Sequence, residues 1–423
     1  MMLILPMGLI ATTLAIAPVR FDREKVFRVK PQDEKQADII KDLAKTNELD
    51  FWYPGATHHV AANMTVDFRV SEKESQAIQS ALDQNKMHYE ILIHDLQEEI
   101  EKQFDVKEDI PGRHSYAKYN NWEKIDFALK IVAWTEKMMD KHPEMVSRIK
   151  IGSTVEDNPL YVLKIGKKNE RRKAIFMDCG IHAREWVSPA FCQWFVYQAT
   201  KTYGRNKIMT KLLDRMNFYI LPVFNVDGYI WSWTKNRMWR KNRSKNQNSK
   251  CIGTDLNRNF NASWDSIPNT NDPCADNYRG SAPESEKETK AFTDFIRSHL
   301  NEIKAYITFH SYSQMLLFPY GYTSKLPPNH EDLAKVAKIG TDVLSTRYET
   351  RYIYGPIEST IYPTSGSSLD WAYDLGIKHT FAFELRDKGK FGFLLPESRI
   401  KPTCRETMLA VKFISKYILK HTS

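Results

Sequence analysis

The chain has 423 residues, 42% of them hydrophobic, with 10 Trp, 20 Tyr and 21 Phe, enough apolar material for a large core in two or three domains. No run of 18 apolar residues occurs, so the sequence predicts no membrane span. The charge is uneven: residues 1–109 contain 13 Lys and Arg against 20 Asp and Glu, a net of −7, whereas the remainder holds 48 basic and 32 acidic residues, a net of +16. This asymmetry indicates two parts with different roles, and the basic part should attract polyanions.

The N-terminus resembles a targeting segment. The apolar run from Leu3 to Ile10 is followed by small residues up to Ala15, which is typical of a secretory signal peptide over residues 1–15. No Lys or Arg precedes the run, and a buried N-terminal strand is the alternative interpretation. We expect a secreted protein, for which nucleic acid is a poor partner because the sequence contains no nucleic-acid-binding motif.

Residues 25–95 form a small unit that alternates between strand and helix patterns, and a helix pattern follows it. We expect strands over 25–30, 60–70 and 89–93, helices over 33–45 and 96–104, and a further helix opened by the capping box Ser71-Glu72-Lys73-Glu74. We interpret the unit as ferredoxin-like, with the order strand–helix–strand–strand–helix–strand. Because its His and carboxylate residues are scattered, we expect a folded prosegment, spanning residues 16–109, rather than an enzyme domain.

The second part begins after a linker. Residues 105–113 are polar and contain Pro-Gly, which favours a linker and a cleavage site near Asp109–Ile110. Helices then alternate with apolar strands, which predicts an α/β domain over 110–423 with a largely parallel or mixed buried sheet. The expected strands cover residues 174–178, 218–224, 304–309 and 380–385.

The five cysteines form no Cys-x-x-Cys zinc pattern. In an oxidising compartment two local bridges are natural, Cys179–Cys192 and Cys251–Cys274, which leaves Cys404 unpaired. The sequence alone does not fix this connectivity.

A candidate metal site combines His182-Ala183-Arg184-Glu185 with His310, 128 residues after His182. Two imidazoles and one carboxylate leave a fourth position open, which is typical of catalytic zinc. The His-x-x-Glu spacing is weak alone, since about one match is expected by chance among the 12 His. The surroundings strengthen it, because His182 and His310 each follow the end of a predicted strand, where ligands bind in open α/β sheets.

Two local features accompany this site. A helix is expected to open at Ser188-Pro189, with Ser188 as its N-cap. Glu384 lies inside the apolar segment Phe381 to Arg386, and burying a carboxylate there is costly unless it is paired or functional. A salt bridge with Arg386 is the alternative to a functional Glu384.

These motifs resemble the zinc metallocarboxypeptidase family of the pancreatic A/B type. The motifs occur in order and cover essentially the whole chain; they are His182-x-x-Glu185, Asn257-Arg258, His310-Ser311-Tyr312-Ser313, Tyr362 and Phe383-Glu384-Leu385-Arg386. The resemblance implies a mixed eight-stranded sheet flanked by helices, preceded by a ferredoxin-like α+β prosegment. It also implies a secreted zymogen that uses one zinc ion per chain to hydrolyse the C-terminal peptide bond of peptides and proteins.

The resemblance assigns roles that the residues alone do not. Arg240 lies in a basic run and would otherwise be solvated surface, and Tyr362 would be one more surface aromatic. The resemblance implies that His182, Glu185 and His310 bind zinc and that Asp255 orients His182. It implies that Glu384 is the general base and that Arg240 stabilises the oxyanion. It also implies that Asn257, Arg258 and Tyr362 bind the substrate's terminal carboxylate and that Arg184 contacts the peptide.

Specificity is expected to depend on Leu369, which matches the base of the family's side-chain pocket. The B-type enzymes carry Asp there, whereas Leu369, with Ile357 and Ala382 beside it by the same comparison, favours aromatic or aliphatic C-terminal residues. The chain departs from the family between Trp122 and Met139, where about six extra residues around 126–131 are not a whole number of helical turns.

Two further expectations follow from the charge and the prosegment. The acidic prosegment should dock on the basic domain by attraction and keep it latent. The basic domain should bind heparin-like proteoglycan, as in storage in secretory granules, and a polyanion-binding granule protein without catalysis is the competing hypothesis. An endopeptidase fits poorly, because a carboxylate clamp needs a free C-terminus and no His-Glu-x-x-His motif occurs.

Overall fold

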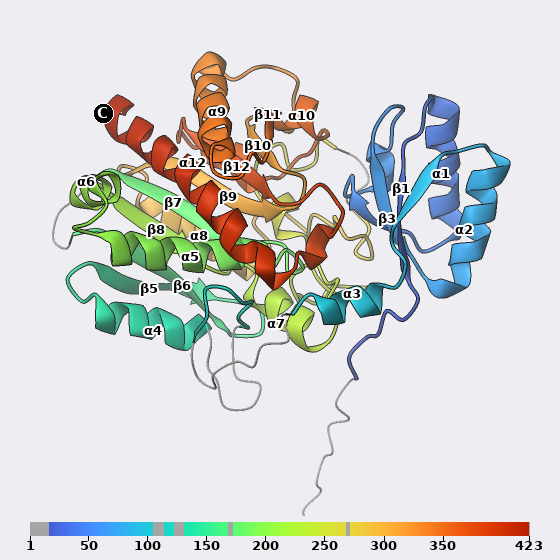
Figure 1. Ribbon diagram of the computed structural model, residues 1–423, viewed down its shortest axis with the longest axis horizontal. Coiled ribbons are helices and arrows are strands. Elements are labelled where there is room, and N and C mark those ends of the chain that lie inside the picture. The colour runs from blue at the N-terminus through green and yellow to red at the C-terminus, as the bar shows by residue number, and fades with distance from the viewer. Residues whose placement is uncertain (1–16, 105–113, 122–130, 168–171, 268–270, 423) are drawn as a thin grey trace, which may run out of the picture.

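The computed structural model describes residues 17–104, 114–121, 131–167, 172–267 and 271–422. The expected signal peptide, the linker with its cleavage site and the extra segment up to residue 130 lie outside the described residues. A small N-terminal unit packs beside a larger one built on a wide sheet (Figure 1).

The N-terminal unit is a four-stranded antiparallel sheet in the order β2-β3-β1-β4, covered by two helices. Its elements are β1 (Lys25–Val29), α1 (Glu34–Thr46), β2 (Asp50–Tyr53), β3 (Val66–Val70), α2 (Glu72–Gln84), β4 (Tyr89–Ile93) and α3 (Leu96–Lys102). This arrangement confirms the ferredoxin-like order. Ser71 caps α2 as predicted, because its Oγ accepts a hydrogen bond from the Glu74 N–H at 3.4 Å.

The strand predicted over 60–70 is wrong in its first half. Only Val66–Val70 is a strand, and a 3-10 turn, η1 (Thr57–His59), precedes it. The chain turns at Asn63, which has φ +62° and donates its N–H to Pro31 O at 2.7 Å. Val60 is buried although it belongs to no strand. The alternation of apolar and polar residues therefore extends through a turn and does not mark a strand there. The second strand of the unit, β2, has four residues and was not located from the sequence.

The larger unit is, as expected, an eight-stranded mixed sheet. Its strands lie in the order β11-β10-β12-β9-β7-β8-β6-β5. Its strands are β5 (Val146–Ser153), β6 (Pro159–Ile165), β7 (Ala174–Cys179), β8 (Asn217–Leu221), β9 (Ile303–Ser311), β10 (Met315–Phe318), β11 (Ile353–Pro356) and β12 (Thr380–Leu385). The central strands β8, β7, β9 and β12 run parallel, so their carboxyl ends lie at one edge.

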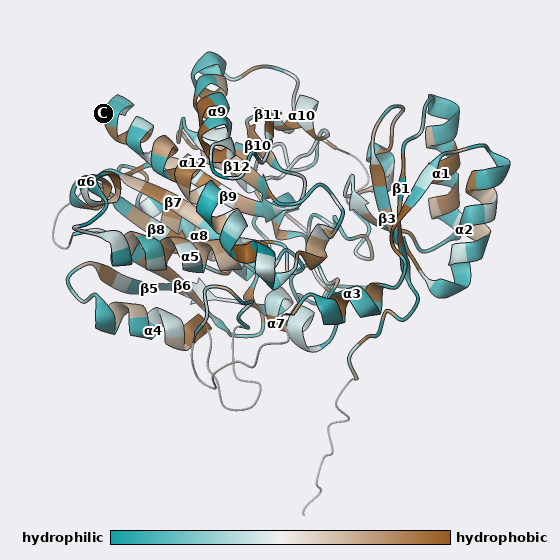
Figure 2. Ribbon diagram, viewed as in Figure 1, coloured by the Kyte–Doolittle hydropathy of each residue, from teal (hydrophilic) through white to brown (hydrophobic). Residues whose placement is uncertain are grey.

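Helices cover both faces of this sheet (Figure 1). They are α4 (Ile131–Lys141), α5 (Val187–Thr202), α6 (Lys207–Arg215), α7 (Val226–Thr234), α8 (Lys287–Ser298), α9 (His330–Ser345), α10 (Ile357–Thr360), α11 (Ser368–Asp374) and α12 (Ile400–His421), with 3-10 turns η2 (Leu256–Arg258), η3 (Gly392–Leu394) and η4 (Glu397–Arg399). Hydrophobic residues concentrate on the strands and the inward helix faces (Figure 2).

Strand β7 contributes side chains to the hydrophobic clusters on both faces of the sheet. Because successive side chains point to opposite faces, Ile175 and Met177 belong to one buried cluster and Phe176 to the other. Phe176 packs edge-to-face on Phe292 of α8, with ring centroids 5.2 Å apart. Each fully buried side chain of this size contributes about 1.5–3 kcal/mol, which keeps the strand ends in place.

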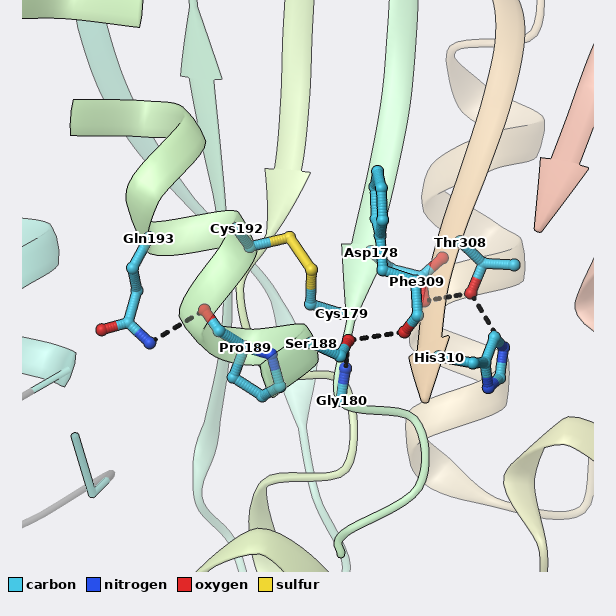
Figure 3. Close-up of a disulfide and its surroundings, with 10 residues drawn as sticks. All are labelled: Asp178, Cys179, Gly180, Ser188, Pro189, Cys192, Gln193, Thr308, Phe309 and His310. Carbon is cyan, nitrogen blue, oxygen red and sulfur yellow. Dashed lines mark hydrogen bonds between the residues drawn. A yellow bond between two sulfur atoms is a disulfide. The ribbon is translucent and has the colours of Figure 1, made fainter. Parts of the chain in front are cut away.

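Both predicted disulfides are present, Cys179–Cys192 and Cys251–Cys274, and Cys404 is a buried free thiol. The first bridge ties the end of β7 to helix α5 (Figure 3). The predicted N-cap is wrong: α5 begins at Val187, after Trp186, which makes no side-chain cap. The Ser188 hydroxyl instead accepts from Gly180 N–H at 3.0 Å and donates to Phe309 O, so it joins the ends of β7 and β9.

Candidate active site

The carboxyl ends of β7, β9 and β12 meet at one edge of the sheet, as the sequence predicted. The three strands are neighbours, and Glu384 of β12 lies directly opposite His310 of β9 in the parallel register. His182 and Glu185 follow β7 in the loop before α5. Segments far apart in the chain thus deliver four candidate residues to one place.

His182, Glu185 and His310 form a group that could hold a metal ion, since one ligand atom from each lies within 4.8 Å of the others. Glu185 Oε1 lies 2.7 Å from His182 Nδ1, and Glu185 Oε2 lies 3.2 Å from His310 Nδ1. The two Nδ1 atoms face each other at 3.2 Å. The ligand atoms of all three groups face one space, a cation there would satisfy them together, and the donor set fits a catalytic zinc site.

Asp255 supports His182 from behind. Its Oδ1 lies 3.1 Å from His182 Nε2, and its Oδ2 accepts hydrogen bonds from Arg240 Nε at 3.1 Å and Nη2 at 2.8 Å. Burial disfavours the charged carboxylate, yet Arg240 and His182 outweigh that effect and hold the pKa of Asp255 well below its ordinary value. Asp255 therefore stays ionised and contacts both His182 and Arg240.

Glu384 has no ion pair with Arg386. The Arg386 guanidinium binds Glu406 instead, so the alternative of a salt bridge with Glu384 is wrong. Glu384 borders a cavity and is otherwise enclosed by protein, and this burial raises its pKa to about 8. A carboxyl group in this setting is suited to exchange protons near neutral pH.

The same cavity is lined by the other predicted substrate residues. These include Arg240, Asn257, Arg258 and Tyr362, together with the pocket residues Ile357, Leu369 and Ala382. Asn257 Oδ1 accepts from Ser368 N–H at 3.0 Å, which ties η2 to helix α11. The apolar pocket wall also contains Leu317 and Ile361, which the sequence did not single out.

The N-terminal unit forms part of the wall of this cavity. Trp52 and Tyr53 of strand β2, and Gly55 just after it, line the cavity together with the metal group. His59 stacks on Tyr362 with ring centroids 4.3 Å apart, and Trp52 packs on Phe393 at 5.1 Å. An incoming peptide would compete with these side chains for the same space.

Charged contacts join the two units. Arg184 is 1% exposed and lies 3.1 Å from Asp50 of β2 and 3.4 Å from Asp276. The Tyr312 hydroxyl donates to Asp67 at 2.9 Å, and Arg28 donates to Lys388 O at 2.7 Å. Arg184, expected beside the peptide, is thus held by the N-terminal unit.

Two residues behind His310 were missed from the sequence. The Thr308 hydroxyl donates to Asp178 Oδ1 at 3.0 Å and lies 3.2 Å from His310 Nε2 (Figure 3). Asp178 lies within the apolar strand Ala174–Cys179. Asp178 is thus a carboxylate inside an apolar strand, the same signal that Glu384 gives in the sequence.

Comparison with known proteins identifies the family. Residues 131–410 match the sequence profile "Zinc carboxypeptidase", and residues 27–103 match "Carboxypeptidase activation peptide". The chain belongs to the zinc carboxypeptidase family. It is 96% identical to mast cell carboxypeptidase A of Homo sapiens over 423 residues, which is all of both chains, and 53% identical to carboxypeptidase B of Bos taurus over 416 residues, 98% of each. The crystal structure of thrombin activatable fibrinolysis inhibitor is 42% identical, with a TM-score of 0.89 over 95% of this chain and 100% of that one.

As a zinc carboxypeptidase, the protein is a zinc-dependent hydrolase with an N-terminal activation peptide, and therefore a zymogen. Zinc is its cofactor, and the His182, Glu185 and His310 group fits that ion. Within the described residues, no helix is both long and apolar enough to cross a membrane.

Proposed function

We propose that this zinc carboxypeptidase is a secreted zymogen whose active form removes aromatic or aliphatic residues from peptide C-termini. The apolar pocket beside the carboxylate clamp carries the proposal. Leu369, at 2% exposure, and Ile357, at 6%, line a cavity whose only acidic side chains among the described residues are Glu185 and Glu384. The A-type name of the 96% identical relative supports the same specificity.

The pocket discriminates by desolvation. An aromatic or aliphatic side chain gains from leaving water, at about 25 cal/mol per Å² of apolar surface buried. A lysine ammonium in the same place would lose its hydration without gaining a partner, which costs several kcal/mol. C-terminal Lys and Arg should therefore be poor substrates.

His182, Glu185 and His310 hold the zinc ion in this proposal. When bound, zinc supplies a Lewis acid that polarises the scissile carbonyl and acidifies a water molecule. Glu384 takes the proton of the attacking water and delivers it to the leaving amine. Arg240, fixed by Asp255, donates hydrogen bonds to the oxygen that becomes negative.

The substrate's terminal carboxylate is bound by Asn257, Arg258 and Tyr362. A guanidinium suits this task because it forms two parallel hydrogen bonds to a carboxylate. Asn257 and Arg258 lie in η2 and Tyr362 follows α10, all beside the apolar pocket, so only a residue with a free carboxylate can fill both. This pairing restricts cleavage to the last peptide bond. Arg184 becomes available to the peptide once the N-terminal unit has left.

The proposed domains are a signal peptide over 1–15, an inhibitory prosegment over 16–109 and a catalytic domain over 110–423. The prosegment contacts in the cavity and its net charge of −7 against +16 support inhibition by docking. The activating cut is proposed near Asp109–Ile110. N-terminal sequencing of the active form tests this boundary, and a start well outside 105–114 would contradict it.

The strong basic charge supports a second proposal, binding to heparin-like proteoglycan and storage in secretory granules. A net of +16 on the catalytic domain should give retention on heparin that falls steeply with salt. Equal elution from heparin and from an uncharged matrix would remove this proposal and leave the enzyme unaffected.

The deciding experiment compares matched peptides that end in Phe or Lys, using the enzyme cleaved near residue 110, with and without a zinc chelator. We expect release of Phe that the chelator abolishes and little release of Lys. Preferential release of Lys would refute the pocket assignment. Release that survives complete removal of zinc would refute the metal mechanism.

A further inference from the structure

His182 and His310, the two histidines of the metal group, both direct the ring nitrogen Nδ1 toward Glu185. Each presents Nδ1 to the shared space: His182 Nδ1 lies 2.7 Å from Glu185 Oε1, and His310 Nδ1 lies 3.2 Å from Glu185 Oε2. Each therefore has Nε2 left to bind the protein. Because a neutral imidazole carries one N–H, the partner of Nε2 decides whether Nδ1 has the lone pair that a metal needs.

The two histidines differ in the group that the other ring nitrogen, Nε2, contacts. His182 Nε2 meets a carboxylate directly, at Asp255 Oδ1. His310 Nε2 meets the Thr308 hydroxyl at 3.2 Å, and that hydroxyl lies 3.0 Å from Asp178 Oδ1. Figure 3 shows the three groups in a row, from Asp178 of β7 through the Thr308 hydroxyl of β9 to the His310 ring. A hydroxyl has a single proton, so its donation to one partner determines what it can do for the other.

The direction of these hydrogen bonds follows from the Asp178 carboxyl group, which accepts the last of them. The Thr308 hydroxyl donates its proton to Asp178 Oδ1, so the oxygen of Thr308 is left to accept from His310 Nε2–H. The proton on Nε2 leaves Nδ1 unprotonated. The arrangement is rigid, because Asp178 and Thr308 are opposite each other in the parallel register of β7 and β9, and are 0% and 1% exposed.

We propose that Asp178 and Thr308 are positioning residues for the metal site, and that they fix the tautomer and ring orientation of His310 through the Thr308 hydroxyl. The inference rests on the proposed function, since it takes His310 as a zinc ligand. In this arrangement both histidine ligands have a carboxylate behind them, Asp255 directly and Asp178 through one hydroxyl.

The test measures zinc binding rather than catalysis, by competition with a chelator of known affinity on the full-length protein. Thr308→Val removes the hydroxyl at nearly constant volume and should raise the zinc dissociation constant about 10- to 100-fold, the usual effect of removing such a partner. Thr308→Ser keeps the hydroxyl and should restore near wild-type affinity. Asp178→Asn keeps an acceptor but loses its charge, and should give an intermediate increase.

A matched control is available on the adjacent strand. The Thr380 side chain is also fully buried, and its hydroxyl has no hydrogen-bond partner among the described residues. Thr380→Val should leave zinc affinity unchanged, which separates loss of the relay from loss of any buried hydroxyl. Thermal unfolding of each variant without metal establishes that it folds.

Proton NMR gives a readout that a purely structural role would not change. Zinc-loaded wild type should show two slowly exchanging imidazole N–H signals from the ligand histidines, and Thr308→Val should lose one. An unchanged zinc dissociation constant in folded Thr308→Val or Asp178→Asn would overturn the relay. If His310→Ala binds zinc like wild type, the proposed ligand set itself is wrong, so the two failures are distinguishable.

Discussion

Asp50 and Arg184 form an ion pair between the prosegment and the catalytic domain, and replacing Asp50 by Asn should loosen that contact. Arg184 Nη1 lies 3.1 Å from Asp50 Oδ1, and the Arg184 side chain is 1% exposed. Arg69 of the prosegment holds the other carboxylate oxygen of Asp50 at 3.0 Å. The substitution preserves the size of the side chain and removes its charge, so it weakens the pair without opening a cavity.

The expected loss of docking free energy depends on the contacts that Arg184 keeps after the substitution. Removing one partner of a buried pair costs about 3–5 kcal/mol when the other is left alone. Arg184 keeps Asp276 Oδ2 and Met238 O, each at 3.4 Å, and the substituted side chain would still offer an amide oxygen. We therefore expect a loss of about 1–2 kcal/mol in docking free energy, which is about 5- to 30-fold in the open fraction.

The assay is hydrolysis of a short peptide ending in Phe by the uncleaved protein, relative to the same protein after activation. Asp50→Asn should raise this ratio by the factor above. Glu24→Gln is the matched control, because Glu24 also binds Arg69 but does not contact Arg184. A ratio in Asp50→Asn equal to wild type would refute the reasoning, and an equal rise in Glu24→Gln would assign the effect to prosegment folding.

Three further predictions concern the cavity. Leu369→Asp should shift release from Phe toward Lys and Arg, since the new carboxylate pairs an otherwise unpaired cation; unchanged preference for Phe, measured as kcat/KM on matched peptides, would show that Leu369 does not form the pocket base. Glu384→Gln should lower kcat at least about 100-fold while zinc content, measured by metal analysis, stays stoichiometric; a kcat within a few-fold of wild type would exclude Glu384 as the base. Acidification should loosen the docked prosegment: burial and Arg258 lower the pKa of His58, and burial with His58 and Arg258 lowers that of His59 to about 2. Because these pKa values are depressed in the docked state, their contribution is complete above about pH 6.5 and is lost as pH falls; the loss from His59 alone is about tenfold at pH 5.5, and His58 adds a loss of the same sign. The ratio of uncleaved to cleaved activity should therefore rise between pH 7.5 and 5.5 and rise less in His59→Gln, and a ratio independent of pH would contradict this.

The sequence predicted the elements that carry strong periodic or chemical signals. Apolar strands of the parallel sheet were recognised because they are buried on both faces, and the rule that ligands gather at their carboxyl ends brought His182, His310 and Glu384 together correctly. Strand β2 was not located because four residues give too short a pattern. Its residues Trp52 and Tyr53 nevertheless line the cavity.

Errors arose where a side chain had a tertiary partner that local patterns do not encode. Ser188 looked like an N-cap, but its hydroxyl links Gly180 to Phe309. Thr308 looked like an ordinary strand residue, yet it lies between Asp178 and His310. Such roles depend on which strands become neighbours, and a single sequence does not state the strand order.

The Cys179–Cys192 bridge has a consequence for how the metal group is assembled. It closes a loop with a sequence separation of 13, and both His182 and Glu185 lie inside that loop. When the rest of the chain unfolds with the bridge intact, these two ligands stay tethered within a few residues of each other. His310 is then the only one of the three ligands that must be brought in from a distant part of the chain. Most of the entropy cost of forming the three-ligand group therefore comes from closing this one long loop.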